Sequence, residues 1–534
     1  MSSVLFLSIP TALILLLVTR DWIRRPSPSV PNGLRELPGP KGYPLIGNLL
    51  DIPTVHSYLA FHSLSRTYGP IFKLNIFGST HVIISSAKIA DDLMARRGGI
   101  YSDRGSLHMV RLVTGGGDVL AASSAEDYVG PAGERGSGGY WRRGRRFSAA
   151  MLTPKMAGAW EPFQEESARK MVIDMVRDPG RYVYWFDRYA SAVGLREVYG
   201  IATGSEDEAE RHTKKIAERM HNIERIATPG GYLVELVPAL LYLPEWLAPF
   251  KREARRLHEI ESGYFRELWD AARKKYVDGE GENPPSFARC LLQEPGKWEI
   301  SDEAEAMYVL GTLYGGGSGT TANAMQSFIL AMVLHPAWQR KVQEEVDGVV
   351  GERVPGFEDM PRLPLVRAVV KEVLRWRPVV AGNLPHRLTQ NDAYNGYHIP
   401  AGSLIHGNQW AIHRDESLYP DPETFNPARF LGKEYPTYKE PLTTNPNIKR
   451  FSAFGFGRRI CPGIETADRS LFIQVLLLVW SCTVSKRVDE NGNEVDVPWY
   501  DYTEGVNVMP RRFEFSLVGR GGRVEVLRES LGMA

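Results

Sequence analysis

Residues 454–463 (FGFGRRICPG) place the strongest constraint on how this chain folds. The three glycines of this segment permit tight or left-handed backbone and the close approach of a flat ligand. Cys461 stands between two arginines and the start of an apolar segment, 471–480, that has the character of a helix. Nearby cations and helix N-terminal amides both lower the pKa of a thiol. Cys461 is therefore predicted to be a thiolate, either a nucleophile or a metal ligand. A buried structural cysteine is the alternative, and such a residue does not need these glycines and arginines.

The other cysteines add no constraint of this kind. The 534 residues contain Cys290, Cys461 and Cys482, none of them in a C-x-x-C pair. A disulfide framework is excluded, and a structural zinc site is disfavoured. A net charge of +1 gives no sign of the strongly basic surface that nucleic-acid binding usually requires. With 43% apolar and 24% charged residues, the chain is neither mainly disordered nor a multi-span membrane protein.

The amino terminus predicts a membrane anchor. Residues 1–19 carry no charge, and Arg20, Arg24 and Arg25 follow them. A membrane span needs about 20 apolar residues, with about 17 as the lower limit. Basic residues after the apolar run argue against a cleaved signal peptide and place the body on the cytosolic side. We predict a signal-anchor transmembrane segment at 1–25, with a cleaved signal or a buried or peripheral segment as alternatives.

The remaining pattern predicts a mainly α chain with a small β portion. Residues 26–53 form a Pro/Gly-rich linker and extended arm, and residues 54–534 form one large catalytic domain. Two β-rich runs, 71–74 and 81–84, predict a hairpin. Most of 140–380 is expected to be helical, with a long amphipathic helix at 251–276. Residues 384–430 are turn-rich, and the tail from 483 alternates as strands do. The Gly-rich stretch 130–139 is expected to be a surface loop or insertion, without assigned chemistry.

The cysteine segment matches F-x-x-G-x-R-x-C-x-G, the haem-binding signature of the cytochrome P-450 family, at every specified position. The resemblance implies the fold of that family and a haem b cofactor whose iron Cys461 binds axially as thiolate. It makes Arg459 a partner of a haem propionate and places Phe454 near the ligand. Gly457 and Gly463 complete the signature. A thiolate ligand donates electron density to iron and favours O–O cleavage.

A second motif of the family is Glu372-Val-Leu-Arg375, followed by Asn426-Pro-Ala-Arg-Phe430. An isolated Glu/Arg pair three residues apart on a helix is usually a solvated surface pair. The resemblance instead implies a buried charge cluster of Glu372, Arg375 and Arg429 that stabilises the segment near the cysteine loop. We expect loss of haem incorporation when this cluster is broken.

Residues 313–321 (LYGGGSGTT) interrupt a helical pattern that runs over 303–332. Each glycine costs about 1 kcal/mol relative to alanine inside a helix. The helix either ends here or continues with a kink, and the apolar pattern that resumes at Ala322 favours continuation. Glycine would let a flat ligand and dioxygen approach the backbone.

This run resembles the family's oxygen-binding groove, [AG]-G-x-[DE]-T-[TS]. Gly316, Gly317, Thr320 and Thr321 match, which assigns the glycines to cofactor binding and the threonines to catalysis. The acid of the motif is replaced by Gly319, so the usual proton relay is in doubt. Ser318, or water in the space of the missing carboxylate, is the expected substitute.

Further basic residues complete the expected haem site. Residues 140–146 (YWRRGRR) resemble the family's W-x-x-x-R motif and assign Trp141 and Arg145 to a propionate. The segment 384–388 (LPHRL) likewise assigns Arg387, with His386 as a structural histidine. The three remaining arginines of the basic stretch are expected to face an acidic reductase: Arg142, Arg143 and Arg146.

We predict a haem-thiolate monooxygenase that inserts one oxygen atom from dioxygen into a lipophilic small molecule. Its expected electron donor is a separate NADPH-dependent flavoprotein reductase, since no G-x-G-x-x-G fingerprint follows a strand. The apolar segment 232–250 is expected to dip into the endoplasmic reticulum membrane beside the substrate entrance, or else to pack in the core. The arm and the Pro-His-Arg segment look most like fungal microsomal members of secondary metabolism, with terpenoid or polyketide substrates. A haem isomerase or dehydratase without a reductase, and a haem sensor, are the alternatives.

Overall fold

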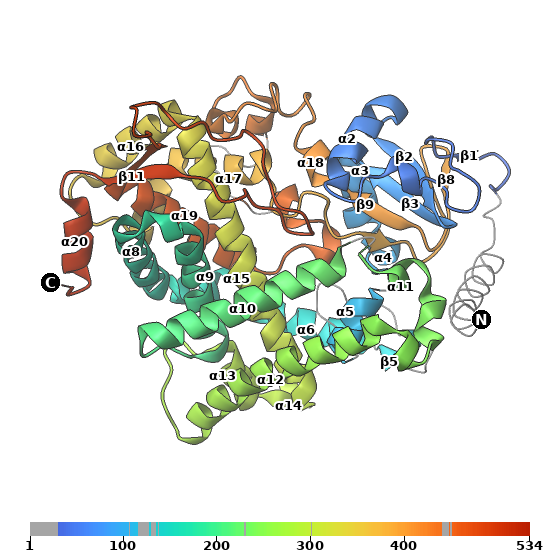
Figure 1. The fold of residues 1–534 in the computed structure, drawn as a ribbon, viewed down its shortest axis with the longest axis horizontal. Helices are drawn as coiled ribbons and strands as arrows, with labels where there is room; N and C mark the ends of the chain where they lie inside the picture. The colour runs from blue at the N-terminus through green and yellow to red at the C-terminus, as the bar shows by residue number, and fades with distance from the viewer. Residues whose placement is uncertain are drawn as a thin grey trace, which may run out of the picture.

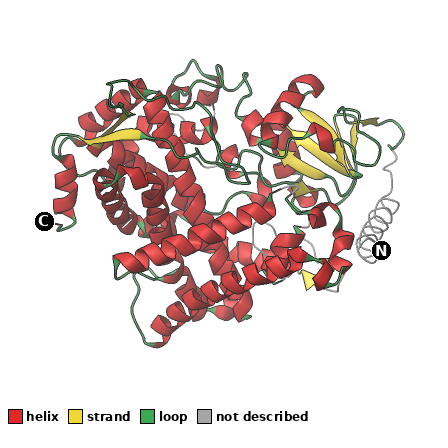
Figure 2. Cartoon of the chain, in the orientation of Figure 1, coloured by secondary structure: helices red, strands yellow, loops and turns green. Residues whose placement is uncertain are grey.

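The computed structural model describes residues 30–105, 107–115, 128–129, 135–136, 138–228, 231–300, 302–439, 448 and 451–533. Helices make up most of this part of the chain, and most strands gather at one side of the molecule (Figure 1). The colouring by secondary structure shows the same division (Figure 2). The predicted mainly α fold with a small β portion is therefore confirmed.

The body is built from ten longer helices among the described residues, joined by shorter ones. The longer helices are α2 (Ser57–Tyr68), α6 (Gly138–Met151), α8 (Glu161–Arg177), α9 (Tyr182–Tyr199), α10 (Glu206–Ala227), α12 (Pro249–Val277), α15 (Glu303–Leu334), α16 (Pro336–Val350), α17 (Pro364–Trp376) and α19 (Ile464–Ser481). Shorter helices are α3 (Ala87–Ala90), α4 (Gly98–Tyr101), α5 (His108–Val113), α7 (Pro154–Ala159), α11 (Leu233–Leu236), α13 (Phe287–Gln293), α14 (Pro295–Trp298), α18 (Gln409–Ile412) and α20 (Arg523–Ser530). The long helix predicted at 251–276 is α12.

Helix α15 runs through the middle of the body and packs against α9 and α19 (Figure 1). The Asp302 side chain caps its start by accepting a hydrogen bond of 2.9 Å from the Ala304 amide. Its residues are buried on nearly all sides, as expected for a helix that is apolar around its circumference. The helix is continuous through the glycine run, so the predicted continuation is confirmed.

The main sheet has the strand order β2-β3-β9-β6. Its strands are β2 (Ile71–Ile76), β3 (Ser79–Ile84), β9 (Leu404–Gly407) and β6 (His386–Arg387). Strands β2 and β3 form the predicted antiparallel hairpin. Its two turn residues, Phe77 and Gly78, both have positive φ, at 48° and 76°, which suits the twist of a two-residue hairpin.

The amino-terminal arm lies against this sheet region. Strand β1 (Arg35–Glu36) pairs in parallel with β8 (Tyr397–Ile399), and β8 pairs with β7 (Asp392–Tyr394). A Cβ at Gly39 would lie 2.1 Å from the Lys73 carbonyl oxygen, so only glycine fits where the arm crosses β2. The predicted extended arm is confirmed for its described residues, from 30 onwards.

The tail differs in part from its prediction. Strands β10 (Cys482–Lys486) and β11 (Phe515–Gly519) pair as expected. The chain then ends in α20, which the alternating pattern did not predict. The helix packs against α8 and α19, and Val524 and Leu527 are buried one turn apart. Tertiary packing of a short amphipathic turn therefore outweighs the local pattern.

The predicted membrane anchor lies outside the described residues. Within the described ranges, no helix has both the length and the apolar character needed to cross a membrane. The signal-anchor predicted at 1–25 lies outside those ranges, and the domain boundaries at 25 and 53 stay predictions. Most of the stretch 130–139 also lies outside them. Its described parts belong to a short β-ribbon, β4 (Tyr128–Val129) with β5 (Arg135–Gly136), and to the start of α6.

Candidate active site

The cysteine loop leads directly into α19. It contains two single turns of 3-10 helix, Ser452–Phe454 and Gly457–Arg459. The Cys461 amide donates to the Phe454 carbonyl oxygen over 2.8 Å, which closes the loop. Gly457 has φ of 56°, and a Cβ there would lie 2.2 Å from the Met94 carbonyl oxygen. The loop is thus a rigid bend that this glycine makes possible.

Burial and the neighbouring positive groups have opposite effects on the pKa of the Cys461 thiol. Burial raises its pKa, whereas the Gly463 amide and the Arg145 guanidinium lower it by smaller amounts. The predicted lowering of the thiol pKa is therefore wrong in direction, because desolvation outweighs the two favourable groups. A coordinated metal ion deprotonates a thiol outright. The site consequently favours metal ligation over a free thiolate nucleophile.

The predicted propionate partners converge on this loop. Arg145 of α6 donates to the Ile460 carbonyl oxygen over 2.9 Å. Arg459 donates to the Ser102 carbonyl oxygen over 2.7 Å, and its guanidinium carbon lies 4.2 Å from the centre of the Trp141 ring. The structure therefore brings Trp141, Arg145 and Arg459 together from α6 and the cysteine loop.

Arg387 joins the same region through Asp103. Its amide donates to the Asp103 carbonyl oxygen over 2.8 Å, and its guanidinium forms an ion pair of 3.3 Å with the Asp103 carboxylate. The preceding residue, His386, is buried and donates from Nδ1 to the Tyr101 carbonyl oxygen over 2.7 Å. His386 is thus a satisfied structural histidine, as predicted.

The sequence analysis missed Arg104. This buried guanidinium donates to the carbonyl oxygens of Leu384 and Pro385 over 2.6 and 2.8 Å. Burial lowers its pKa to about 10, with Asp103 raising it and Arg145 lowering it further. In the sequence, Arg104 follows an acid in a short loop and looks like half of a surface pair. No pattern distinguishes it from one.

These residues fit a ligand with two carboxylates. Arg104, Arg145, Arg387 and Arg459 are here called the arginine cluster. Asp103 forms an ion pair with Arg387 and raises the pKa of Arg104, while Arg145 and Arg459 donate to backbone carbonyl oxygens beside the cysteine loop. Within that part of the chain, the buried Trp141 indole N–H and the Ser102 hydroxyl have no hydrogen-bond partner. Buried polar groups are normally satisfied. A haem with its propionates directed at the cluster would supply acceptors for these two groups and carboxylates beside the arginines.

The glycine run of α15 supplies a second open surface. Gly316 and Gly317 are exposed although most of the helix is buried. A Cβ at either position would meet nothing within 4 Å. The half-buried Thr320 is one turn further along and donates from Oγ1 to the Gly316 carbonyl oxygen over 2.9 Å. Gly316, Gly317 and Thr320 therefore line one open face, as a flat ligand and a small gas molecule would require.

Two other predicted catalytic residues are placed differently. Ser318 is buried, and its hydroxyl donates to the Tyr314 carbonyl oxygen over 2.8 Å. A Cβ at Gly194 of α9 would lie 3.5 Å from this hydroxyl, so Ser318 points toward α9 rather than toward the open face. Its placement does not support the predicted role as substitute for the acid. Thr321 is also buried.

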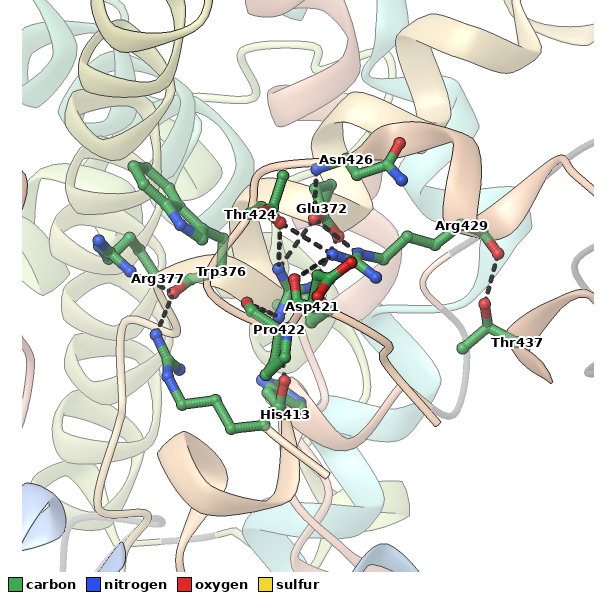
Figure 3. A network of polar contacts seen from close by, with 12 residues as sticks. Glu372, Trp376, Arg377, His413, Asp421, Pro422, Thr424, Asn426, Arg429 and Thr437 are labelled. Carbon is green, nitrogen blue, oxygen red and sulfur yellow. Dashed lines mark hydrogen bonds and ion pairs between the residues drawn. The ribbon is translucent and has the colours of Figure 1, made fainter. Parts of the chain in front are cut away.

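The predicted charge cluster joins Glu372 of α17 to Arg429 and the backbone around Thr424 (Figure 3). The Glu372 carboxylate accepts from Arg375 over 2.7 and 2.9 Å and from Arg429 over 3.1 Å. All three side chains are at most 1% exposed. Both arginines also donate to the Thr424 carbonyl oxygen, so the cluster ties α17 to the segment that leads toward Cys461. The buried cluster is confirmed, and the surface pair is excluded.

Comparisons with known proteins agree with this geometry. The model of the cytochrome P-450 family matches residues 37–496. A cytochrome P-450 monooxygenase of Armillaria gallica is 34% identical over 476 residues, 89% of this chain and 86% of the relative. Cytochrome P-450 monooxygenase 58 of Postia placenta is 34% identical over 513 residues, 95% of this chain and 92% of the relative. The monooxygenase virE of Hypocrea virens is 31% identical, over 90% of this chain and 85% of the relative.

A solved structure shows the same fold. A zebrafish cytochrome P-450, described with abiraterone, has a TM-score of 0.65 at 22% identity and covers 87% of this chain and 100% of its own. The family model and the relatives cover most of the body, including the cysteine loop, the arginine cluster and the glycine run. This chain belongs to the cytochrome P-450 family.

Proposed function

We propose that this chain is a haem-thiolate monooxygenase that inserts one atom of dioxygen into a lipophilic small molecule. The observation that carries the proposal is the convergence of Cys461 with the arginine cluster. A single thiol beside several cations and unpartnered buried donors suits an anionic macrocycle with a metal at its centre. The monooxygenase names of the relatives agree with this reading.

The residues have distinct roles in this proposal. Cys461 would bind the haem iron through its sulfur, and Phe454, whose carbonyl oxygen accepts from the Cys461 amide, would lie near the bound group. Arg145, Arg459, Arg387, Arg104 and Trp141 hold the propionates. The haem, when bound, supplies the oxygen-activating chemistry. Gly316 and Gly317 leave room for the macrocycle and dioxygen, and Thr320 offers a hydroxyl at the same face.

The proposed electron donor is an NADPH-dependent flavoprotein reductase. Of the three arginines expected to meet it, Arg142 is exposed. Arg143 is instead held by Glu305 of α15 through two contacts of 2.8 Å. Arg146 is exposed and forms a longer pair of 3.4 Å with Glu299. We therefore assign the docking contact to Arg142 and Arg146 and a structural role to Arg143.

Membrane attachment is proposed to involve the segment 232–250 as well as the amino terminus. Leu233, Tyr242 and Trp246 are 69%, 62% and 72% exposed. All three lie within residues 233–246, and exposed leucine, tyrosine and tryptophan side chains suit the edge of a bilayer. We propose the endoplasmic reticulum membrane as the location, with a catalytic domain in the cytosol and substrates of fungal secondary metabolism.

A labelled-oxygen experiment tests the activity. The purified protein and a flavoprotein reductase are supplied with NADPH, ¹⁸O₂ and a panel of terpenoid and polyketide precursors. We expect a product that carries one ¹⁸O atom and forms only with NADPH. An unlabelled isomerised or dehydrated product that forms without reductase would contradict the proposal. Nothing among the relatives favours that alternative, since those compared are named monooxygenases.

A further inference from the structure

The glycines of α15 do different things on different sides of the helix. Gly316 and Gly317 face open space, as described above. Gly319 instead faces α10, where a Cβ would lie 3.7 Å from the side chain of Met220. This is ordinary van der Waals contact, so a side chain at 319 is sterically possible. The absence of the family acid at this position is therefore not imposed by crowding at the Cβ.

Gly315 is needed because a charged side chain approaches it. A Cβ there would lie 2.2 Å from Arg219 Nη1. Arg219 of α10 is 7% exposed, and its Nε donates over 2.9 Å to the carboxylate of Glu261 of α12, which is 4% exposed. The guanidinium also lies over the Phe265 ring, 5.0 Å from its centre. A buried ion pair thus packs against the turn of α15 that precedes Gly319.

The pair is incompletely satisfied. Arg219 Nη2 and Glu261 Oε1 are buried and have no hydrogen-bond partner within the described ranges. A buried ion pair with spare donor and acceptor atoms is a poor source of stability, because desolvation offsets its attraction. Internal water commonly binds at such atoms. These features favour a role for the pair other than stability.

We propose that Glu261, positioned by Arg219, takes the place of the acid that α15 lacks at position 319. In this arrangement the Glu261 carboxylate takes a proton from internal water on its own side of the 315–320 turn and passes it through internal water toward the open face at Thr320. The inference rests on the proposed monooxygenase function. Glu261 and Arg219 are positioning residues here, since neither touches the open face directly.

Two contacts support the exchange of one carboxylate for the other. The Met220 sulfur lies 3.4 Å from Arg219 Nη1, and the same side chain borders position 319. A carboxylate at 319 would therefore lie close to the guanidinium that now binds Glu261. Glu261 also lies near Tyr308 of α15, where burial and the charge of Glu261 both raise the pKa of the Tyr308 hydroxyl. The Tyr308 hydroxyl lies 3.2 Å from Nδ1 of the half-buried His258, and the same nitrogen donates to the Val113 carbonyl oxygen over 2.8 Å.

The test moves the carboxylate between the two positions. Glu261→Gln, and Glu261→Gln combined with Gly319→Asp, are prepared as holoenzymes and supplied with reductase and NADPH without added substrate. The fraction of NADPH electrons recovered as hydrogen peroxide is measured together with the thermal unfolding midpoint. Since a positioned acid speeds proton transfer by roughly 10²-fold or more, we expect the peroxide fraction to rise about twofold or more in Glu261→Gln. Gly319→Asp should return the fraction and the midpoint toward the wild-type values.

Controls separate this role from a structural one. Glu267→Gln on the same helix removes a carboxylate that pairs with Arg211 and Lys215 at the surface and should leave the peroxide fraction unchanged. Arg219→Met with Glu261→Leu removes both buried charges, which usually preserves stability. This variant should keep the wild-type midpoint and still show the raised peroxide fraction, even if Glu261→Gln alone fails to fold.

Several outcomes would overturn the inference. An unchanged peroxide fraction in the paired variant, or a wild-type protein that already releases all its electrons as peroxide, excludes Glu261 as the proton source. A rise that Gly319→Asp fails to reverse also excludes it. These outcomes differ from failure of the proposed function, in which the wild-type protein itself lacks the thiolate-type carbonyl spectrum.

Discussion

Replacing Glu372 with glutamine removes one negative charge from the buried charge cluster of Figure 3 and exchanges one carboxylate oxygen for an amide NH₂ group. The Glu372 carboxylate accepts four hydrogen bonds: two from Arg375, one from Arg429 and one of 2.7 Å from the Asn426 amide. The NH₂ group of glutamine would face N–H donors of Arg375, Arg429 or Asn426, and a donor cannot accept their hydrogen bonds. Two fully buried guanidinium groups would then keep only carbonyl oxygens as partners.

The expected loss is large relative to the stability of a protein. Removing one partner of a buried ion pair costs about 3–5 kcal/mol, against a total free energy of unfolding of about 5–15 kcal/mol. Urea unfolding followed by circular dichroism gives this loss from the midpoint and slope. The cluster ties α17 to the segment before the cysteine loop, so the haem content per protein, read from the Soret band, should fall as well.

The matched control is Glu494→Gln. Glu494 pairs with Lys486 over 3.3 Å at the surface and is 67% exposed, so its loss should change the free energy of unfolding by less than about 1 kcal/mol. If Glu372→Gln unfolds within about 1 kcal/mol of the wild type and retains its haem, the cluster does not have the structural role argued here.

Three further predictions concern the Glu235 carboxyl group, the cysteine loop and the membrane. Burial raises the pKa of Glu235 to about 7, although this carboxylate accepts hydrogen bonds from the amides of His108 and Met109. Between the pKa values of the unfolded and folded states, the folded protein therefore binds one more proton than the unfolded chain. The stability of the wild type should fall between about pH 5 and about pH 8, and that of Glu235→Gln should fall less. Parallel thermal unfolding midpoints in the two proteins would contradict this. Gly457→Ala should lower the free energy of unfolding by about 1 kcal/mol or more, because position 457 has a positive φ and a Cβ there would clash with Met94. Gly348→Ala, inside α16 with open space around it, should instead raise the free energy of unfolding by about 0.5–1 kcal/mol. Urea unfolding of both variants measures these changes. Removing residues 1–25 should release the protein from membranes only partly, and adding Trp246→Ser should release more, as measured by flotation; complete release by the truncation alone would exclude 232–250 as a membrane contact.

The motifs could be located from the sequence because each combines rare residue types at fixed spacing. Glu372, Arg375 and Arg429 illustrate this, since Arg429 is 57 residues from Glu372 and still meets it as predicted. Gly316 and Gly317 were likewise recognisable because glycine inside a helix has a cost that needs a reason. The hairpin that turns at Phe77–Gly78 followed from the two β-rich runs on either side of it.

What the sequence did not show depends on the surroundings of single side chains. The pKa of Cys461 moves up rather than down because desolvation, which no spacing reports, outweighs the neighbouring cation. Ser318 differs from Thr320 by two positions, and the rotation of the helix directs it toward α9. Arg143 looked available for a partner until Glu305 of α15 was seen beside it. Arg219 and Glu261 lie 42 residues apart on α10 and α12, and no motif marks either residue, so their pairing behind the glycine run had no signal in the sequence.

The ferrous carbonyl spectrum of Cys461→Ser tests thiolate ligation most directly. The wild-type protein should show the red-shifted Soret band that a thiolate ligand produces. Serine offers a weak and poorly deprotonated ligand, so the variant should lose this band together with NADPH-dependent product formation, while its arginine cluster still holds some haem. Retention of the red-shifted band in Cys461→Ser would show that another residue binds the iron and would contradict the assignment of Cys461.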